Sequence, residues 1–89
     1  MSLSKGEILE IDGKNGERIL TIVKMVGSDT NNGRESDIHL WDIKVSKVEG
    51  RITKSTQNAY RIRSMSNFKR LNPRKVTIDP LGRIRRAGD

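Results

Sequence analysis

The chain has 89 residues, which suits one small domain, and its formal net charge is +7. Twelve of the 18 Lys and Arg residues follow residue 45 and face only three acidic residues there. Such a basic half is typical of polyanion binding, although it also occurs as plain solvated surface or as a dock for an acidic protein. The absence of cysteine excludes disulfides, thiolate catalysis and cysteine-rich zinc sites.

The elements expected in chain order are short strands, because ten Ile and five Val residues supply most of the apolar set. Turn residues separate them, as in Gly13-Lys14-Asn15-Gly16 and Pro80-Leu81-Gly82. Residues 66–73 are expected as a basic connection. The expected strands cover residues 6–12, 17–26, 38–45, 59–64 and 74–79, with a helix as the alternative at 17–26. Residues 51–58 end in a polar cluster, and residues 83–86 form a short basic strand or a tail. The fold class is therefore mostly β, as a small strongly bent antiparallel sheet or an SH3-like barrel of six or seven short strands.

The domain organisation expected is simple. Residues 1–4 resemble an expression leader, and residues 5–89 form a single domain, which we expect to have been excised from a longer protein. No apolar run reaches membrane-spanning length and no signal peptide is visible, so a cytoplasmic protein with no membrane partner is expected.

The motifs of common enzymes are absent. There is no Walker loop, GxGxxG, HExxH or GxSxG sequence. His39 is the single histidine, flanked by Asp37 and Asp42, and a solvated strand face explains this pattern better than a metal site does. We expect no catalytic residue, metal or cofactor in this segment.

The polar stretch at residues 28–34 is the first candidate site. A turn explains its Asn, Gly and Asp residues. The same residue types also read base edges, since Asp accepts from cytosine N4, Arg bridges guanine O6 and N7, and Asn pairs with adenine. The candidate residues are Asp29, Asn31, Asn32 and Arg34.

Two further sets could position a phosphate backbone. Ser55, Thr56, Gln57 and Asn58 offer hydroxyl, amide and backbone donors, although a capped turn is an equally good interpretation. The second set is basic, and a subset on one face would follow the phosphates with strong salt dependence. It comprises Lys54, Arg61, Arg63, Lys69, Arg70, Arg74, Lys75, Arg83, Arg85 and Arg86.

Three motifs together resemble a known family. Residues 28–34 (SDTNNGR) resemble a D-x-x-N-G-R hairpin, residues 55–58 (STQN) an S-T-Q-N element, and residues 76–82 (VTIDPLG) a terminal strand and turn. These occur, in this order, in the C-terminal domains of compact type II-C CRISPR RNA-guided DNA endonucleases. Two features depart from the family: residues 59–72 are longer than expected, and IHLWD replaces a W-H-D order, so His39 inherits no role.

The resemblance implies a domain that reads the protospacer-adjacent motif (PAM) of double-stranded DNA, while guide RNA reads the target by base pairing. It implies that Asp29 and Arg34 sit at the major groove and favour a C·G pair. It also implies a bacterial parent enzyme acting in antiviral defence. The parent, rather than this segment, would be the endonuclease and contact the guide RNA, and anti-CRISPR inhibitor proteins would be possible partners.

Two other functions stay open at this point. A free-standing SH3-like or KOW-like RNA- or ribosome-associated module would use the same basic face without reading bases. A protein-interaction adaptor would dock an acidic partner there. An independent enzyme is the least favoured interpretation.

Overall fold

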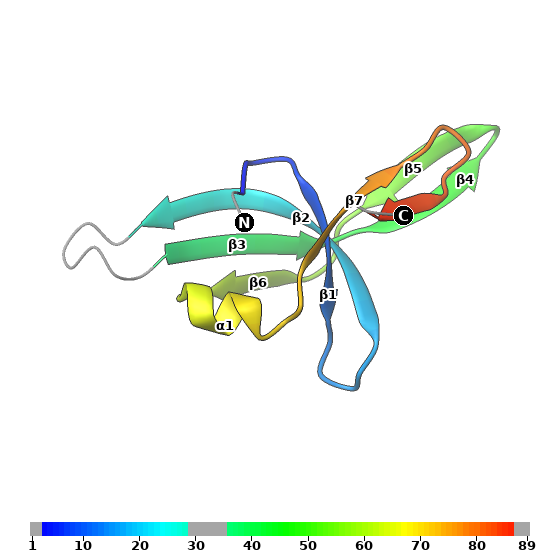
Figure 1. Ribbon diagram of the computed structural model, residues 1–89. Coiled ribbons are helices and arrows are strands. Elements are labelled where there is room, and N and C mark those ends of the chain that lie inside the picture. Colours follow the sequence, from blue (N-terminus) through cyan, green and yellow to red (C-terminus); the bar gives the residue numbers. More distant parts are fainter. Residues whose placement is uncertain (1–2, 29–35, 87–89) are drawn as a thin grey trace.

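A computed structural model describes residues 3–28 and 36–86 of the chain. Eight short strands and one short helix account for most of these residues (Figure 1). In chain order they are β1 (Ile8–Asp12), β2 (Arg18–Ser28), β3 (Ser36–Asp42), β4 (Lys44–Val48), β5 (Arg51–Ser55), β6 (Ala59–Ile62), α1 (Met65–Lys69), β7 (Arg74–Ile78) and β8 (Ile84–Arg86).

The strands form two antiparallel sheets. Six belong to a main sheet with the order β6-β3-β2-β1-β7-β8, and β4 and β5 form a separate two-stranded ribbon. The prediction of a mostly-β antiparallel fold is confirmed. The main sheet has β6 and β8 at its two edges, and the eight strands exceed the six or seven expected.

The main sheet bends along β2, its longest strand. The first part of β2 pairs with β1 (Asp12↔Arg18 to Ile8↔Ile22), and its second part pairs with β3 up to Ser28↔Ser36. The register shifts between Val23 and Met25, where a bulge bends and twists the strand. As a result, β3 and β6 run across the direction of β1 and β7 in Figure 1.

The core fills one face of the main sheet. Strand alternation places apolar side chains from β1, β2 and β3 on this face, where α1 covers them with Phe68. Thr21 is fully buried among them, and its hydroxyl donates to the Leu9 carbonyl at 3.0 Å. The fully or nearly fully buried members of this core are Leu9, Ile11, Val23, Ile38, Leu40 and Phe68.

Two details differ from the expectations. The segment expected as one strand at 38–45 is divided at the buried Ile43, so that β3 stays in the main sheet while β4 leaves it. The connection expected at 66–73 contains α1, which Ser64 caps by accepting from the Asn67 amide at 3.2 Å. The helix forms because this cap satisfies a free amide and Phe68 gains burial.

Glu10 is the one carboxylate among the described residues that is buried, and it joins three strands. From β1 it accepts from Arg18 Nε of β2 at 3.2 Å and from Arg86 of β8 at 3.0 and 2.9 Å. Arg18 also donates to Asp12 Oδ1 at 2.6 Å and to the Asn72 carbonyl at 3.0 Å. The Arg86 hydrogen bonds, supported by Arg18, hold the pKa of Glu10 below its usual value despite burial.

Replacing Glu10 by Gln should lower the free energy of unfolding at pH 7 by roughly 1.5–3 kcal/mol, the contribution of hydrogen bonds to a charged group. Because the folded-state pKa is depressed, the carboxylate stabilises above the ordinary value of 4.5 and loses its contribution as the pH falls through the folded-state pKa. Urea unfolding at pH 7 and in acid should therefore show a difference that narrows in acid. Glu49→Gln, at an exposed turn, is the control. A difference independent of pH would contradict this role for Glu10.

Candidate nucleic-acid interface

The stretch expected to read bases lies outside the described residues. Asp29, Asn31, Asn32 and Arg34 all belong to it. The structure describes the two strands on either side of this stretch, β2 and β3, which pair as far as Ser28↔Ser36. The stretch therefore connects two adjacent antiparallel strands of the main sheet, as expected.

The stretch Ser55–Asn58 is held by the carboxylate of Asp42. Asp42 Oδ1 accepts from the backbone amides of Gln57 and Asn58 at 2.9 and 2.8 Å, and Oδ2 accepts from Asn58 Nδ2 at 2.9 Å. The hydrogen bonds from the Asn58 and Gln57 amides lower the pKa of Asp42. These hydrogen bonds hold residues 57 and 58 in the connection between β5 and β6. All four residues of the stretch are exposed, and Asn58 uses its side-chain amide to bind Asp42.

Half of the basic set considered from the sequence pairs with carboxylates within the fold. Arg61 makes a bidentate contact with Asp37 at 2.9 and 2.7 Å, which lowers the pKa of Asp37 to about 2. Lys75 Nζ lies 2.8 Å from Glu7 Oε2. The remaining pairs in this half are Arg83–Asp79, Arg85–Asp79 and Arg86–Glu10.

The other five cations of this set have no carboxylate partner in the described ranges. Within residues 3–28 and 36–86, no salt bridge reaches Lys54, Arg63, Lys69, Arg70 or Arg74, and all five are exposed. Four of them flank α1: Arg63 follows β6, Lys69 and Arg70 end the helix, and Arg74 begins β7. We call Arg63, Lys69, Arg70 and Arg74 the α1 basic cluster. Arg63 follows Ile62, which pairs with Ile38 near the start of β3, so the cluster begins at the end of the sheet where 29–35 attach.

The acidic residues around His39 do not converge on a metal site. His39 Nε2 lies 3.6 Å from Asp37 Oδ2, on the carboxylate that Arg61 already occupies. Both carboxylate oxygens of Asp42 accept hydrogen bonds from Gln57 or Asn58. Within the described part of the chain, no three acidic or histidine side chains gather around one point.

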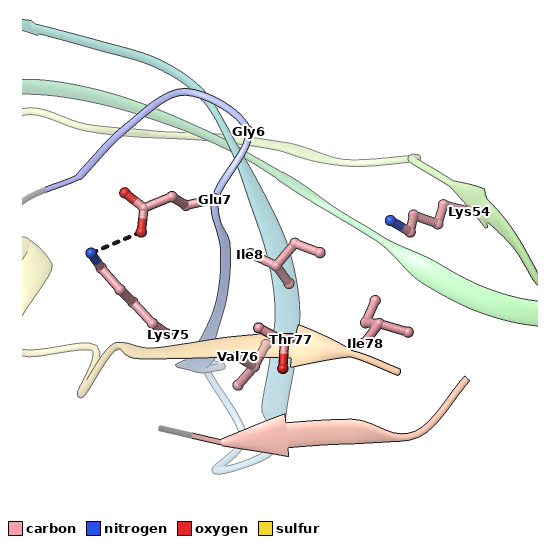
Figure 2. A pocket seen from close by; sticks show the side chains of 8 residues that line it. All are labelled: Gly6, Glu7, Ile8, Lys54, Lys75, Val76, Thr77 and Ile78. Atoms are coloured by element: carbon pink, nitrogen blue, oxygen red, sulfur yellow. Dashed lines mark ion pairs between the residues drawn. The ribbon is translucent and has the colours of Figure 1, made fainter. Parts of the chain in front are cut away.

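A groove of about 370 Å³ lies between β1, β7 and the end of β5 (Figure 2). Ile8, Val76 and Ile78 contribute its apolar surface. Lys75 in this groove is paired with Glu7, and Lys54 stands apart on the β5 side. Because its residues come from three distant segments, no local sequence pattern marked this groove.

Comparisons with known proteins add no relative. No protein-family model, curated protein or solved structure matches the chain. Within the residues that the structure describes, no helix is long and apolar enough to span a membrane.

Replacing Asp42 by Ala should loosen the β5–β6 connection at Gln57 and Asn58, since both amides lose their acceptor. Hydrogen exchange at these two amides should accelerate roughly tenfold, the effect of losing about 1–1.5 kcal/mol. Two-dimensional NMR measures this exchange, and amides of β1 should be unaffected. Glu49→Ala removes a carboxylate that accepts no hydrogen bond from the described residues and serves as the control. Unchanged exchange at Gln57 and Asn58 in Asp42→Ala would show that the β5–β6 connection does not depend on this carboxylate.

Proposed function

We propose that the chain is a duplex-DNA-binding module, the PAM-interacting part of a bacterial type II-C CRISPR RNA-guided DNA endonuclease. The structural observation that carries the proposal is how charge is distributed. Every carboxylate of the described residues except Glu49 accepts a hydrogen bond within the fold. The α1 basic cluster keeps four exposed cations, which supports binding to a phosphate backbone.

The order of the three sequence motifs supports the more specific part of the proposal. The proposed base-reading stretch joins β2 to β3, and the α1 basic cluster begins at the same end of the sheet. In this proposal the cluster holds the backbone while Asp29 and Arg34 contact a C·G pair in the major groove. An acidic contact beside phosphates is selective, because its repulsion is tolerable only when a cytosine amino group lies opposite and Arg34 lies near enough to offset the charge.

The proposal places catalysis elsewhere in the parent enzyme. This segment would need no cofactor, and the parent would hold the guide RNA and act in the bacterial cytoplasm. Arg61 has a smaller part than the sequence suggested, because Asp37 neutralises it. Its side chain is 53% exposed, so it can still donate a remaining N–H to a phosphate.

The alternative of an RNA- or ribosome-associated module predicts a different binding preference. Such a module would bind structured RNA at least as well as duplex DNA, without base preference. Competition between a DNA duplex and an RNA hairpin on the 89-residue chain separates the two proposals.

The decisive test is a randomised-PAM depletion assay on the parent enzyme. Asp29→Ala and Arg34→Ala should each relax the preference at one PAM position, because each good base contact contributes roughly 1–3 kcal/mol of discrimination. Glu49→Ala removes an exposed carboxylate elsewhere and should leave the PAM unchanged. An unaltered PAM in both variants would refute the assignment of these two residues.

A further inference from the structure

The ribbon of β4 and β5 is a surface that the resemblance does not assign. Its five cross-strand pairs run from Lys44↔Ser55 to Val48↔Arg51. It shares no strand pairing with the main sheet and projects from it beside β7 and β8 (Figure 1). One face of the ribbon is therefore turned toward β7 and β8, and the opposite face is turned away from them.

The inner face packs toward the β7–β8 turn. Val45 and Ile52 are half-buried, and a Cβ placed at Gly82 would lie 3.9 Å from Ile52 Cδ1. Because strand side chains alternate, the residues next to Val45 in β4 and next to Ile52 in β5, and every second residue from them, point the other way. They define the outer face of the ribbon: Lys44, Ser46, Val48, Arg51, Thr53 and Ser55.

The outer face combines cations with hydroxyls and contains no carboxylate. All six residues are exposed. Ser46 Oγ and Thr53 Oγ1 lie 2.7 Å apart at its centre. Lys44 and Arg51 form no salt bridge within the described part of the chain. Hydroxyl groups and unpaired cations are the groups that contact phosphate oxygens.

The position of the ribbon suits a long, regular polyanion. The chain measures 49 × 25 × 21 Å, and the ribbon lies at the opposite end from the end of β2 and the start of β3 (Figure 1). This length exceeds the roughly 34 Å of one turn of DNA. A single duplex can therefore contact both ends, and a two-stranded ribbon is narrow enough to lie along a groove.

The composition of the ribbon points to the backbone rather than to bases. Residues 44–55 include no aromatic side chain, so stacking on unpaired bases has no platform. We propose that the outer face of the ribbon binds the phosphate backbone of double-stranded DNA, independent of base identity, as a second contact remote from Asp29 and Arg34. This inference rests on the proposed function for its ligand.

The test is the salt dependence of duplex binding by the 89-residue chain. Fluorescence anisotropy measures the binding constant at a series of salt concentrations that begins at low salt. The slope of log K against log salt is negative. The double variant Lys44→Gln/Arg51→Gln should reduce its magnitude by about 1.8, because each of two lost phosphate contacts contributes about 0.9. Base preference should stay as in the unmodified chain. The conservative variant Lys44→Arg/Arg51→Lys should retain the slope.

The matched control is Lys14→Gln/Lys24→Gln. It removes the same charge from two exposed cations that form no salt bridge in the described ranges. Equal slopes for the ribbon variant and this control would overturn the inference, since only overall charge would then matter. Preferential binding of single-stranded DNA or an RNA hairpin through Lys44 and Arg51 would also overturn it.

Failure of the proposed function gives a different result. Lys69→Gln/Arg70→Gln tests the α1 basic cluster in the same assay. Loss of slope in this variant but not in the ribbon variant contradicts only the ribbon inference. Loss in the ribbon variant, with no base preference in the unmodified chain, supports the ribbon and contradicts the proposed reading of a PAM. A chain that binds no duplex at low salt contradicts both.

Discussion

The Asp42 carboxylate fastens the chain at the two points where the ribbon joins the main sheet. Asp42 ends β3, just before the chain leaves the sheet, and its two oxygens hold Gln57 and Asn58, where the chain returns. The adjacent Ile43 is buried and donates its amide to the Leu20 carbonyl of β2 at 2.9 Å. These contacts set how the ribbon stands relative to the sheet, and they allow one small chain to present two separate surfaces.

The same use of carboxylates explains which cations remain available. Glu7, Glu10, Asp37 and Asp79 all pair with Lys or Arg side chains from other strands or turns. The pairs of Glu7, Glu10 and Asp37 connect elements that are distant in sequence, most clearly Glu10 with Arg86, whereas Asp79 pairs with Arg83 and Arg85 across the adjacent turn. The net charge of +7 is therefore carried mainly by the cations that have no carboxylate partner in the described ranges. The exposed cations without internal partners in the described ranges include the α1 basic cluster and the two cations on the outer face of the ribbon.

The sequence predicted the strands well because their signals are local. Ile and Val mark segments such as β1 and β7, and the Gly-containing turns between them are short. The helix α1 was missed because five residues are too few to show a helical period, and only Ser64 offered a start signal. The division at Ile43 was missed because the apolar alternation continues through it, although the chain changes sheets there.

Only the residue types of the candidate site could be predicted from the sequence, and the arrangement of these residues could not. A basic series can be counted from the sequence, but its pairing depends on which carboxylates the fold brings near. Arg61 and Arg63 are two residues apart, yet Asp37 neutralises Arg61, and Arg63 has no salt bridge within the described part of the chain. Asp42 lies 15 and 16 residues from the amides that it binds, so no local pattern identified it as a cap.

The most direct measurement is an NMR titration of the 89-residue chain with a DNA duplex that contains a C·G pair. Chemical shifts should change at residues 29–34, in the α1 basic cluster and along the outer face of the ribbon. Resonances around Glu10 and Arg18 should stay in place. Shift changes centred on the paired cations Lys75, Arg83 and Arg85, with residues 29–34 and the α1 basic cluster unaffected, would contradict the proposed interface.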